Sequence, residues 1–222
     1  MSQHVFFVEM QKTLSISRAK TFVPLASKRL EANNHPSIMA WVPLNESWGV
    51  RNIFSDKQQQ NFAVSLYYII KSMDTTRIVT TNDGWEQVKS DICGIHEYIA
   101  WGDNFAVKYD NREKSLEKGA GWRLPYAEGT VYEGQPYLIT EYGGIAFENG
   151  ESENWGYNGA VKDEESFMKR YDSITRAIQK TTYICGYCYT QLTDVMQEVN
   201  GLMTMHRKVK VKIEEVKNVN TK

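Results

Sequence analysis

Two apolar runs in this sequence each end on a glutamate, a residue that can act as an acid, a base or a nucleophile. The first run, Ile38 to Leu44, has the length of a strand buried on both faces, and it stops at Asn45-Glu46. The second run begins at Tyr137 and stops at Glu141. Parallel strands of a barrel present catalytic groups at their carboxyl ends. Two strands that end this way predict a carboxylate pair, which is typical of glycoside cleavage.

Retaining glycoside cleavage places a strict geometric demand on such a pair. One carboxylic acid protonates the leaving oxygen while one carboxylate attacks the anomeric carbon, and the two groups lie ~5–5.5 Å apart. Glu46 and Glu141 are far apart in the sequence, so only a closed or nearly closed sheet brings them together. An arbitrary glutamate is usually a residue of an ordinary surface turn, so a strand end by itself does not establish a catalytic role.

Three blocks of sequence surround these strands and cover nearly the whole chain. They are His35-Pro36-Ser37-Ile38 with Trp41 and Asn45-Glu46-Ser47; Ile139 to Gly144; and Gly186 to Asp194 followed by Gln197 to Leu202. In this order they resemble the acid/base signature, the nucleophile strand and the last barrel strand of glycoside hydrolase family 2, the β-galactosidase and β-glucuronidase family. The resemblance implies a retaining hydrolase that cleaves terminal β-glycosidic bonds of a carbohydrate by double displacement, with no cofactor.

The resemblance also implies roles for residues at the two strand ends. Glu46 would end barrel strand four as the general acid/base, and Glu141 would end strand seven as the nucleophile. Asn45 stands where related barrels bind the sugar 2-hydroxyl, and hydrogen bonds to that hydroxyl strengthen in the transition state. A simple turn role for Asn45 stays open.

Further polar residues follow the strand that ends near residue 98. The resemblance implies that His96 and Tyr98 contact the sugar or orient Glu141, and that Tyr142 steers the nucleophile. A structural role for His96 stays open, because a lone histidine in a strand is often part of the core.

Asp83 and Trp85 follow the predicted fifth strand, where an aromatic side chain would offer a sugar a stacking face. Packing in the core stays open for Trp85, and Trp41, inside its strand, is expected to be core. Gln191 and Asp194 end the last strand, where the wider family often carries a tryptophan, so they receive no role.

The elements that must position these residues alternate along the chain, which predicts βα units and a parallel sheet. Strands are predicted near residues 6, 40, 79, 94, 139 and 187. Helices are predicted over 18–33, 56–73, 164–180 and about 213–219, with Ser55 and Asp163 as N-caps of the second and third. Residues 99–135 show no convincing period and are expected to form a long connection.

Six strands are fewer than the eight of a complete barrel. The predicted fold class is therefore α/β, a partial (β/α)8 TIM barrel of about strands three to eight. Residues 1–222 would form a single incomplete catalytic domain, without the N-terminal β-sandwich domains of the family. An unpaired strand edge predicts poor solubility or self-association through that edge.

The overall composition limits which classes of partner and which cellular compartment are expected. The net charge is −1 and no basic tract is present, which argues against nucleic acid. No apolar run reaches the ~20 residues that span a bilayer, and no His/Asp/Glu cluster has metal-ligand spacing. Three cysteines do not form a disulfide framework, and Cys185 and Cys188 would point to opposite faces of a strand. A cytoplasmic protein with buried thiols is expected.

Two other interpretations stay open. One is an inactive truncated fragment, or a carbohydrate-binding remnant, of such an enzyme. The other is an endo-acting glycanase of the same barrel clan, which shares the Asn-Glu pair and the second glutamate. That clan fits the His-Pro-Ser-Ile and Thr-Gln-Leu-Thr-Asp blocks poorly.

Overall fold

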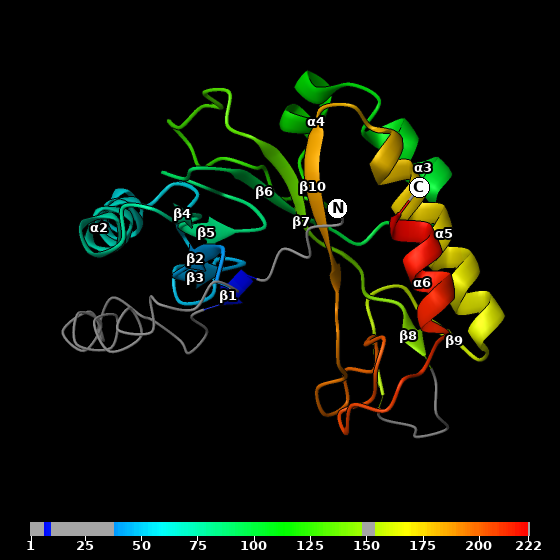
Figure 1. Cartoon of the computed structure of the whole chain (residues 1–222). Helices are drawn as coiled ribbons and strands as arrows, with labels where there is room; N and C mark the ends of the chain where they lie inside the picture. Colours follow the sequence, from blue (N-terminus) through cyan, green and yellow to red (C-terminus); the bar gives the residue numbers. More distant parts are fainter. Residues whose placement is uncertain (1–6, 10–37, 148–153, 222) are drawn as a thin grey trace. The chain divides into compact units, whose positions relative to one another are not determined.

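The structure, a computed structural model, describes residues 7–9, 38–147 and 154–221, in which strands alternate with helices (Figure 1). The chain divides into two compact units. The N-terminal unit contains the described residues up to His96 together with Leu116–Leu138. The C-terminal unit contains Glu97–Ser115 and the described residues from Ile139 onward.

Parallel strand pairs form the centre of the N-terminal unit. Its strands are β1 (Phe7–Glu9), β2 (Ala40–Val42), β3 (Leu44–Asn45), β4 (Ile78–Val79), β5 (Asn82–Asp83) and β6 (Cys93–Glu97, which ends in the other unit). β1, β2 and β4 form a parallel sheet in that order, and β3 pairs with β5, also in parallel. The predicted α/β class with parallel strands is confirmed, whereas the assignment to barrel strands three to eight stays a prediction.

One register runs through both of these strand pairs. Ala40 lies opposite Ile78 in β2 and β4, and Asn45 lies opposite Asp83 in β3 and β5. The two chain segments therefore end at the same level, as parallel neighbours do. The polar residues that follow β3 and β5 are consequently brought side by side.

The helix α2 (Lys57–Met73) covers this sheet and confirms the prediction for residues 56–73 apart from its cap. The N-cap is Asp56, whose carboxylate accepts hydrogen bonds from the backbone N–H groups of Gln58 and Gln59. Ser55 was predicted to be the cap, which is wrong by one residue, because the helix begins at Lys57 and the residue before it is Asp56. A carboxylate caps a helix at least as well as a hydroxyl.

The apolar core of the N-terminal unit is built on Trp41, which confirms its expected core position. Trp41 is 1% exposed and packs with Val79 and the α2 residues Ala63, Leu66 and Ile70. Its indole N–H donates to the Asp74 carboxylate over 2.9 Å, and Arg77 pairs with the same carboxylate at 2.9 Å. A single buried acid therefore satisfies the polar atom of the largest core side chain.

The C-terminal unit contains strands and amphipathic helices. They are β7 (Tyr137–Gly143, in this unit from Ile139), β8 (Ala146–Phe147), β9 (Ala160–Val161), β10 (Ile184–Thr190), α3 (Gly102–Lys108), α4 (Arg112–Lys118, which ends in the other unit), α5 (Glu164–Lys180) and α6 (Ile213–Asn220). β7 and β10 are neighbours in one sheet, and β8 pairs with β9 in parallel.

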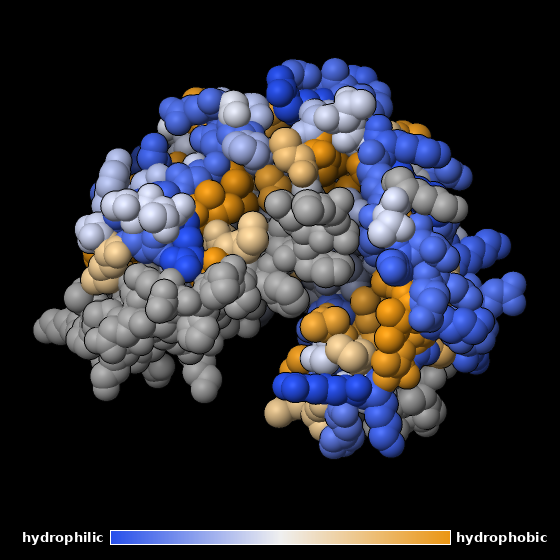
Figure 2. All heavy atoms as spheres, viewed as in Figure 1, coloured by the Kyte–Doolittle hydropathy of each residue, from blue (hydrophilic) through white to orange (hydrophobic). Residues whose placement is uncertain are grey.

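The helices α5 and α6 confirm the predicted helices near the C-terminus. Asp163 caps α5 through the N–H of Ser166, as predicted. Phe167 and Tyr171 of α5 pack with Val219 of α6 in one apolar cluster, and the helices lie side by side in Figure 1. Hydrophilic side chains gather over their outer side in Figure 2, as expected for amphipathic helices.

Some sequence predictions differ from the structure or lie outside it. Residues 99–135 contain α3 and α4, so the expectation of one long connection is wrong for these residues. Each of these helices has seven residues, two turns, which is too short for a hydrophobic period to be visible. The predicted strand near residue 6 is represented by β1, and the predicted helix over 18–33 lies outside the described residues.

The cysteines are free thiols in the structure. Cys93 is buried as expected, whereas Cys185 is exposed, so the expectation of buried thiols is wrong for that residue. In the described part of the chain, β10 has a strand neighbour on one side only, β7. No helix among residues 38–147 and 154–221 is long and apolar enough to cross a membrane.

We predict that Asp74→Ala lowers the free energy of unfolding by about 1–3 kcal/mol at neutral pH, because it leaves the Trp41 N–H buried without an acceptor. Burial by itself raises the pKa of Asp74, but hydrogen bonds from Trp41, Thr76 and Arg77 outweigh it and hold the pKa far below its usual range. The stabilisation is therefore complete above the unfolded pKa of about 3.9 and is lost as the pH falls through the folded value.

Thermal or urea unfolding across pH 2–7 measures this effect. Glu113→Ala removes an exposed carboxylate paired with Arg112 and serves as the control, with a midpoint expected to stay nearly unchanged. An Asp74→Ala protein as stable as the parent at pH 7 would contradict the prediction.

Candidate active site

Glu46 follows β3 in a turn whose backbone is left-handed at two successive residues. The φ angle is +51° at Glu46 and +59° at Ser47, values that residues other than glycine adopt rarely. The Glu46 N–H donates to the carbonyl of Asp83 over 2.9 Å, which anchors the turn to the end of β5. The turn leaves the Glu46 carboxylate partly accessible, with its side chain 18% exposed.

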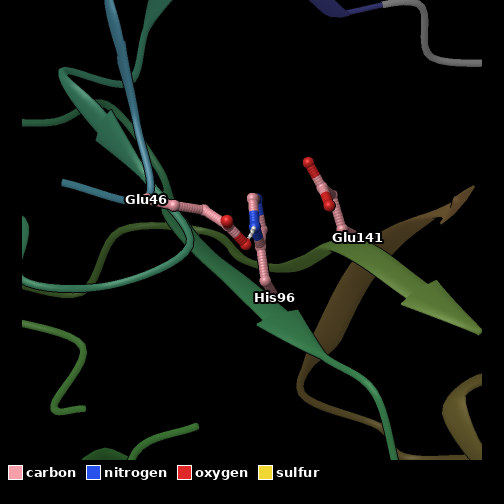
Figure 3. A group of neighbouring side chains, drawn as sticks. All are labelled: Glu46, His96 and Glu141. Carbon is pink, nitrogen blue, oxygen red and sulfur yellow. Dashed lines mark hydrogen bonds and ion pairs between the residues drawn. The ribbon is translucent and has the colours of Figure 1, made fainter. Parts of the chain in front are cut away.

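The Glu46 carboxylate is directed at the ring of His96, which comes from β6 (Figure 3). Oε1 of Glu46 lies 2.8 Å from Nδ1 of His96, and Nε2 on the other side of the ring lies 3.3 Å from Oδ2 of Asp83. The His96 side chain is fully buried, and the Asp83 side chain is 6% exposed. Three residues that the sequence singled out separately therefore form one continuous chain of polar contacts.

Two proton arrangements satisfy both ring contacts of His96. In one, the ring is an imidazolium that donates to two carboxylates. In the other, the ring is neutral, its Nε2–H donates to Asp83, and Nδ1 accepts the proton of a protonated Glu46. The second arrangement is an acid with its proton held at hydrogen-bonding distance, which is the state from which a carboxylic acid can protonate a leaving group.

Gly84 and Trp85 complete the surroundings of the His96 ring. A Cβ on Gly84, whose φ is +99°, would lie 2.9 Å from Cγ of His96, so the ring occupies the space that a side chain would need. The Trp85 ring meets His96 edge-on at 5.8 Å between ring centroids. Trp85 therefore lines the site beside His96 and is partly buried. Its indole N–H has no hydrogen-bond partner among the described residues.

Sequence reasoning missed a group of polar side chains next to the Glu46 turn that are hydrogen-bonded to one another: the buried Ser47, Asn82 and Glu86, and the partly buried Arg123. A buried Ser and Glu beside a predicted turn carry no periodic or motif signal. Their proximity depends on the β3–β5 pairing, and on the loop that carries Arg123.

In the C-terminal unit, Glu141 projects from β7 and is partly buried (Figure 3). It accepts a hydrogen bond from the Tyr98 hydroxyl. The Tyr98 ring stacks on Tyr157, with ring centroids 3.7 Å apart and nearly parallel planes. Gly144 makes room for this stack, because a Cβ there would lie 2.4 Å from the Tyr157 ring. The expectation that Tyr98 contacts the sugar or orients Glu141 stays a prediction.

Tyr142 occupies a different place from the one expected. Neighbouring residues of a strand point to opposite faces, and the Tyr142 ring is fully buried with its hydroxyl 2.8 Å from that of Thr175 in α5. Burial raises the pKa of Tyr142 far above its usual value. Tyr142 therefore packs in the core of the C-terminal unit rather than beside the carboxylate that it was expected to steer.

The remaining candidates lie at strand ends. Asn45 is the last residue of β3 and is 8% exposed. Asp194, which follows β10, pairs with Lys210 at 2.8 Å and accepts from the Gly201 N–H. Gln191 is bonded to Asn200, so both polar residues after β10 hold the loop that follows.

The comparisons with known proteins identify the class and then the family. Residues 20–222 match the sequence model of the TIM barrel domain of glycosyl hydrolases family 2. An α/β chain with parallel strands, with one glutamate just after β3 and another on β7, is consistent with this class. Since the match covers most of the chain, the protein belongs to glycosyl hydrolase family 2. A search of the curated proteins finds no match.

Solved structures of this family share the fold. A β-galacturonidase from Eisenbergiella tayi bound to galacturonate has a TM-score of 0.67 at 19% identity, covering 96% of this chain and 40% of that one. A β-glucuronidase from Faecalibacterium prausnitzii has a TM-score of 0.61 at 16% identity over 91% and 34%. A Bacteroides uniformis β-glucuronidase gives 0.58 at 17% over 92% and 26%. The chain spans less than half the length of these proteins.

We predict that Gly84→Ala destabilises the N-terminal unit more than Gly134→Ala does. Both glycines have strongly positive φ, +99° and +90°, but a Cβ on Gly134 meets nothing within 4 Å, whereas one on Gly84 meets the His96 ring. The difference between the two variants isolates the contact and is expected to be about 1–3 kcal/mol. Urea unfolding measures it, and equal losses would contradict the close packing of His96 on Gly84.

Proposed function

We propose that this chain carries the catalytic carboxylates of a retaining glycoside hydrolase that cleaves terminal β-glycosidic bonds by double displacement. Glu46 acts as the general acid/base and Glu141 as the nucleophile. The observation that carries the proposal is the chain of contacts from Glu46 through His96 to Asp83, in a protein of glycosyl hydrolase family 2.

In the first step, Glu46 protonates the glycosidic oxygen. Asp83 accepts the Nε2–H of a neutral His96, so Nδ1 faces Glu46 with a lone pair and holds the proton there until it is transferred. After the transfer, the Glu46 carboxylate is the base that takes a proton from water in the second step.

Glu141 attacks the anomeric carbon as the leaving oxygen departs, giving a covalent glycosyl–enzyme. The hydroxyl of Tyr98 donates to one oxygen of Glu141, which orients the carboxylate for this attack. In the second step water, deprotonated by Glu46, displaces Glu141 from the anomeric carbon. No metal or cofactor takes part in these steps.

The proposed substrate is a carbohydrate with a terminal β-linked sugar. Two named relatives are a β-galacturonidase and a β-glucuronidase, so β-glycuronides are proposed ahead of β-galactosides. Asn45 and Trp85 are proposed to contact the sugar, whereas Asp83 acts through His96. An assay with aryl β-galacturonide, β-glucuronide and β-galactoside decides among these sugars.

We predict that Glu46→Ala lowers kcat/KM about 10²–10⁴-fold for alkyl glycosides and much less for 2,4-dinitrophenyl glycosides, whose leaving group departs without protonation. Added azide should restore turnover of the activated substrate and give a β-glycosyl azide, since it needs no base. The exposed Glu113→Ala variant is the control and should retain parental rates. Equal losses on both kinds of substrate would show that Glu46 is not the acid/base.

We also predict that a 2-fluoro-glycoside inactivator labels Glu141. The fluorine slows the second step, so the glycosyl–enzyme accumulates, and peptide mapping by mass spectrometry locates the added mass. Glu141→Gln should show no label, while Glu113→Ala should be labelled like the parent protein. A label on another residue would refute the assignment, and saturable sugar binding without any turnover would favour a carbohydrate-binding remnant.

A further inference from the structure

We propose that Glu86 is a positioning residue that clamps the left-handed turn carrying Glu46. The inference rests on the proposed function, because it assigns Glu86 to the acid/base step of that reaction. Glu86 would act through Ser47, without contact to the substrate.

The turn at Glu46 and Ser47 needs an external restraint. Both residues are left-handed, with φ of +51° and +59°, and neither glutamate nor serine favours this conformation as glycine or asparagine does. Residues persist in such conformations when their surroundings over-determine them, and such positions cluster at functional sites.

Hydrogen bonds to Ser47 supply that restraint from two directions. The Ser47 N–H donates to Oδ1 of Asn82 over 2.9 Å, and Nδ2 of Asn82 donates to Oγ of Ser47 over 3.0 Å. The Ser47 hydroxyl in turn donates to Oε2 of Glu86 over 2.5 Å. Ser47 is 1% exposed and Asn82 is fully buried, so water does not compete for these bonds.

Glu86 is itself held from the opposite side. Its carboxylate pairs with Arg123 at 2.8 Å, and the Arg123 guanidinium lies over Trp85 and Trp122, at 5.2 and 4.1 Å from the ring centroids. The Glu86 N–H donates to the carbonyl of Leu124. A carboxylate accepts hydrogen bonds and cannot donate them, so Glu86 also fixes the direction of the Ser47 hydroxyl proton.

The consequence concerns the acid/base step alone. Releasing Ser47 lets the turn relax toward ordinary backbone angles and moves Glu46 relative to His96 and the leaving oxygen. A misplacement of about 1 Å can cost about 100-fold in rate. The loss falls on substrates whose leaving group needs a proton, which is a signature that general destabilisation does not produce.

Glu86→Ala tests the clamp, and Asp74→Ala is its matched control. Both variants remove a buried carboxylate paired with an arginine in the same unit, with side chains 6% and 3% exposed, but only Glu86 contacts the Glu46 turn. Glu86→Ala should lower kcat/KM about 10–100-fold more for alkyl than for 2,4-dinitrophenyl glycosides. Asp74→Ala should leave that ratio unchanged.

Hydrogen–deuterium exchange gives a readout that does not depend on activity. The N–H groups of Glu46, Ser47, Trp48 and Val50 are all hydrogen-bonded in the structure, so a peptide covering residues 45–50 should exchange slowly. Exchange should accelerate about tenfold or more in Glu86→Ala relative to Asp74→Ala when the two are compared at equal stability, since Asp74→Ala causes only the general loss of stability. Glu86→Gln keeps one acceptor oxygen for Ser47, and its exchange rate should lie between those of the parent and Glu86→Ala.

Unchanged exchange over residues 45–50 in Glu86→Ala would overturn the clamp. Faster exchange with an unchanged leaving-group ratio would overturn its role in positioning the acid/base. If the parent chain hydrolyses nothing, the proposed function fails separately, and exchange still decides whether Glu86 holds the turn. If Glu86→Ala does not fold, the same two measurements on Glu86→Gln decide.

Discussion

The arrangement of the N-terminal unit depends on one constraint, the single register in which residues 40–45 and 78–83 run parallel. Because both segments end at the same level, the Glu46 turn is bonded to the end of β5 through the Asp83 carbonyl. At the end of β5, the Asp83 side chain also contacts His96 of β6. A shift of one residue would turn each of these side chains to the opposite face of its strand, so the polar contacts exist only in this pairing.

Each buried carboxylate next to the Glu46 turn has a hydrogen-bonding or charged partner. Asp83 faces His96, and Glu86 faces both Arg123 and a serine hydroxyl. A buried ion pair is often no more stabilising than an apolar substitute of the same shape. Here each carboxylate sets the orientation of its neighbour, because a carboxylate can only accept and the neighbouring group must point its proton at it. In the C-terminal unit, neighbouring residues of β7 point to opposite faces of the strand. Glu141 is hydrogen-bonded to Tyr98, whereas Tyr142 packs in the core.

Much of the local structure could be predicted from the sequence. The helix at 164–180 with its Asp163 cap follows from a carboxylate before an amphipathic run, and local hydrogen bonding is enough to define it. The strand before Glu46, the strand that carries Glu141 and the family also follow from short blocks of sequence. Local patterns did not predict α3 and α4, whose two turns are too short to establish a period.

The sequence by itself determined where the candidate carboxylates stand along the chain and which elements precede them, because strand length, caps and motifs are local properties. The tertiary structure decided what surrounds them. Tyr142 belongs to the core, Asp83 acts on His96 rather than standing alone, and Glu86 reaches Ser47. None of these facts is encoded by spacing, since each depends on strand register and on a contact between segments 13 or more residues apart. Strand register is determined by many contacts acting together, so only the folded chain determines which polar groups come into contact.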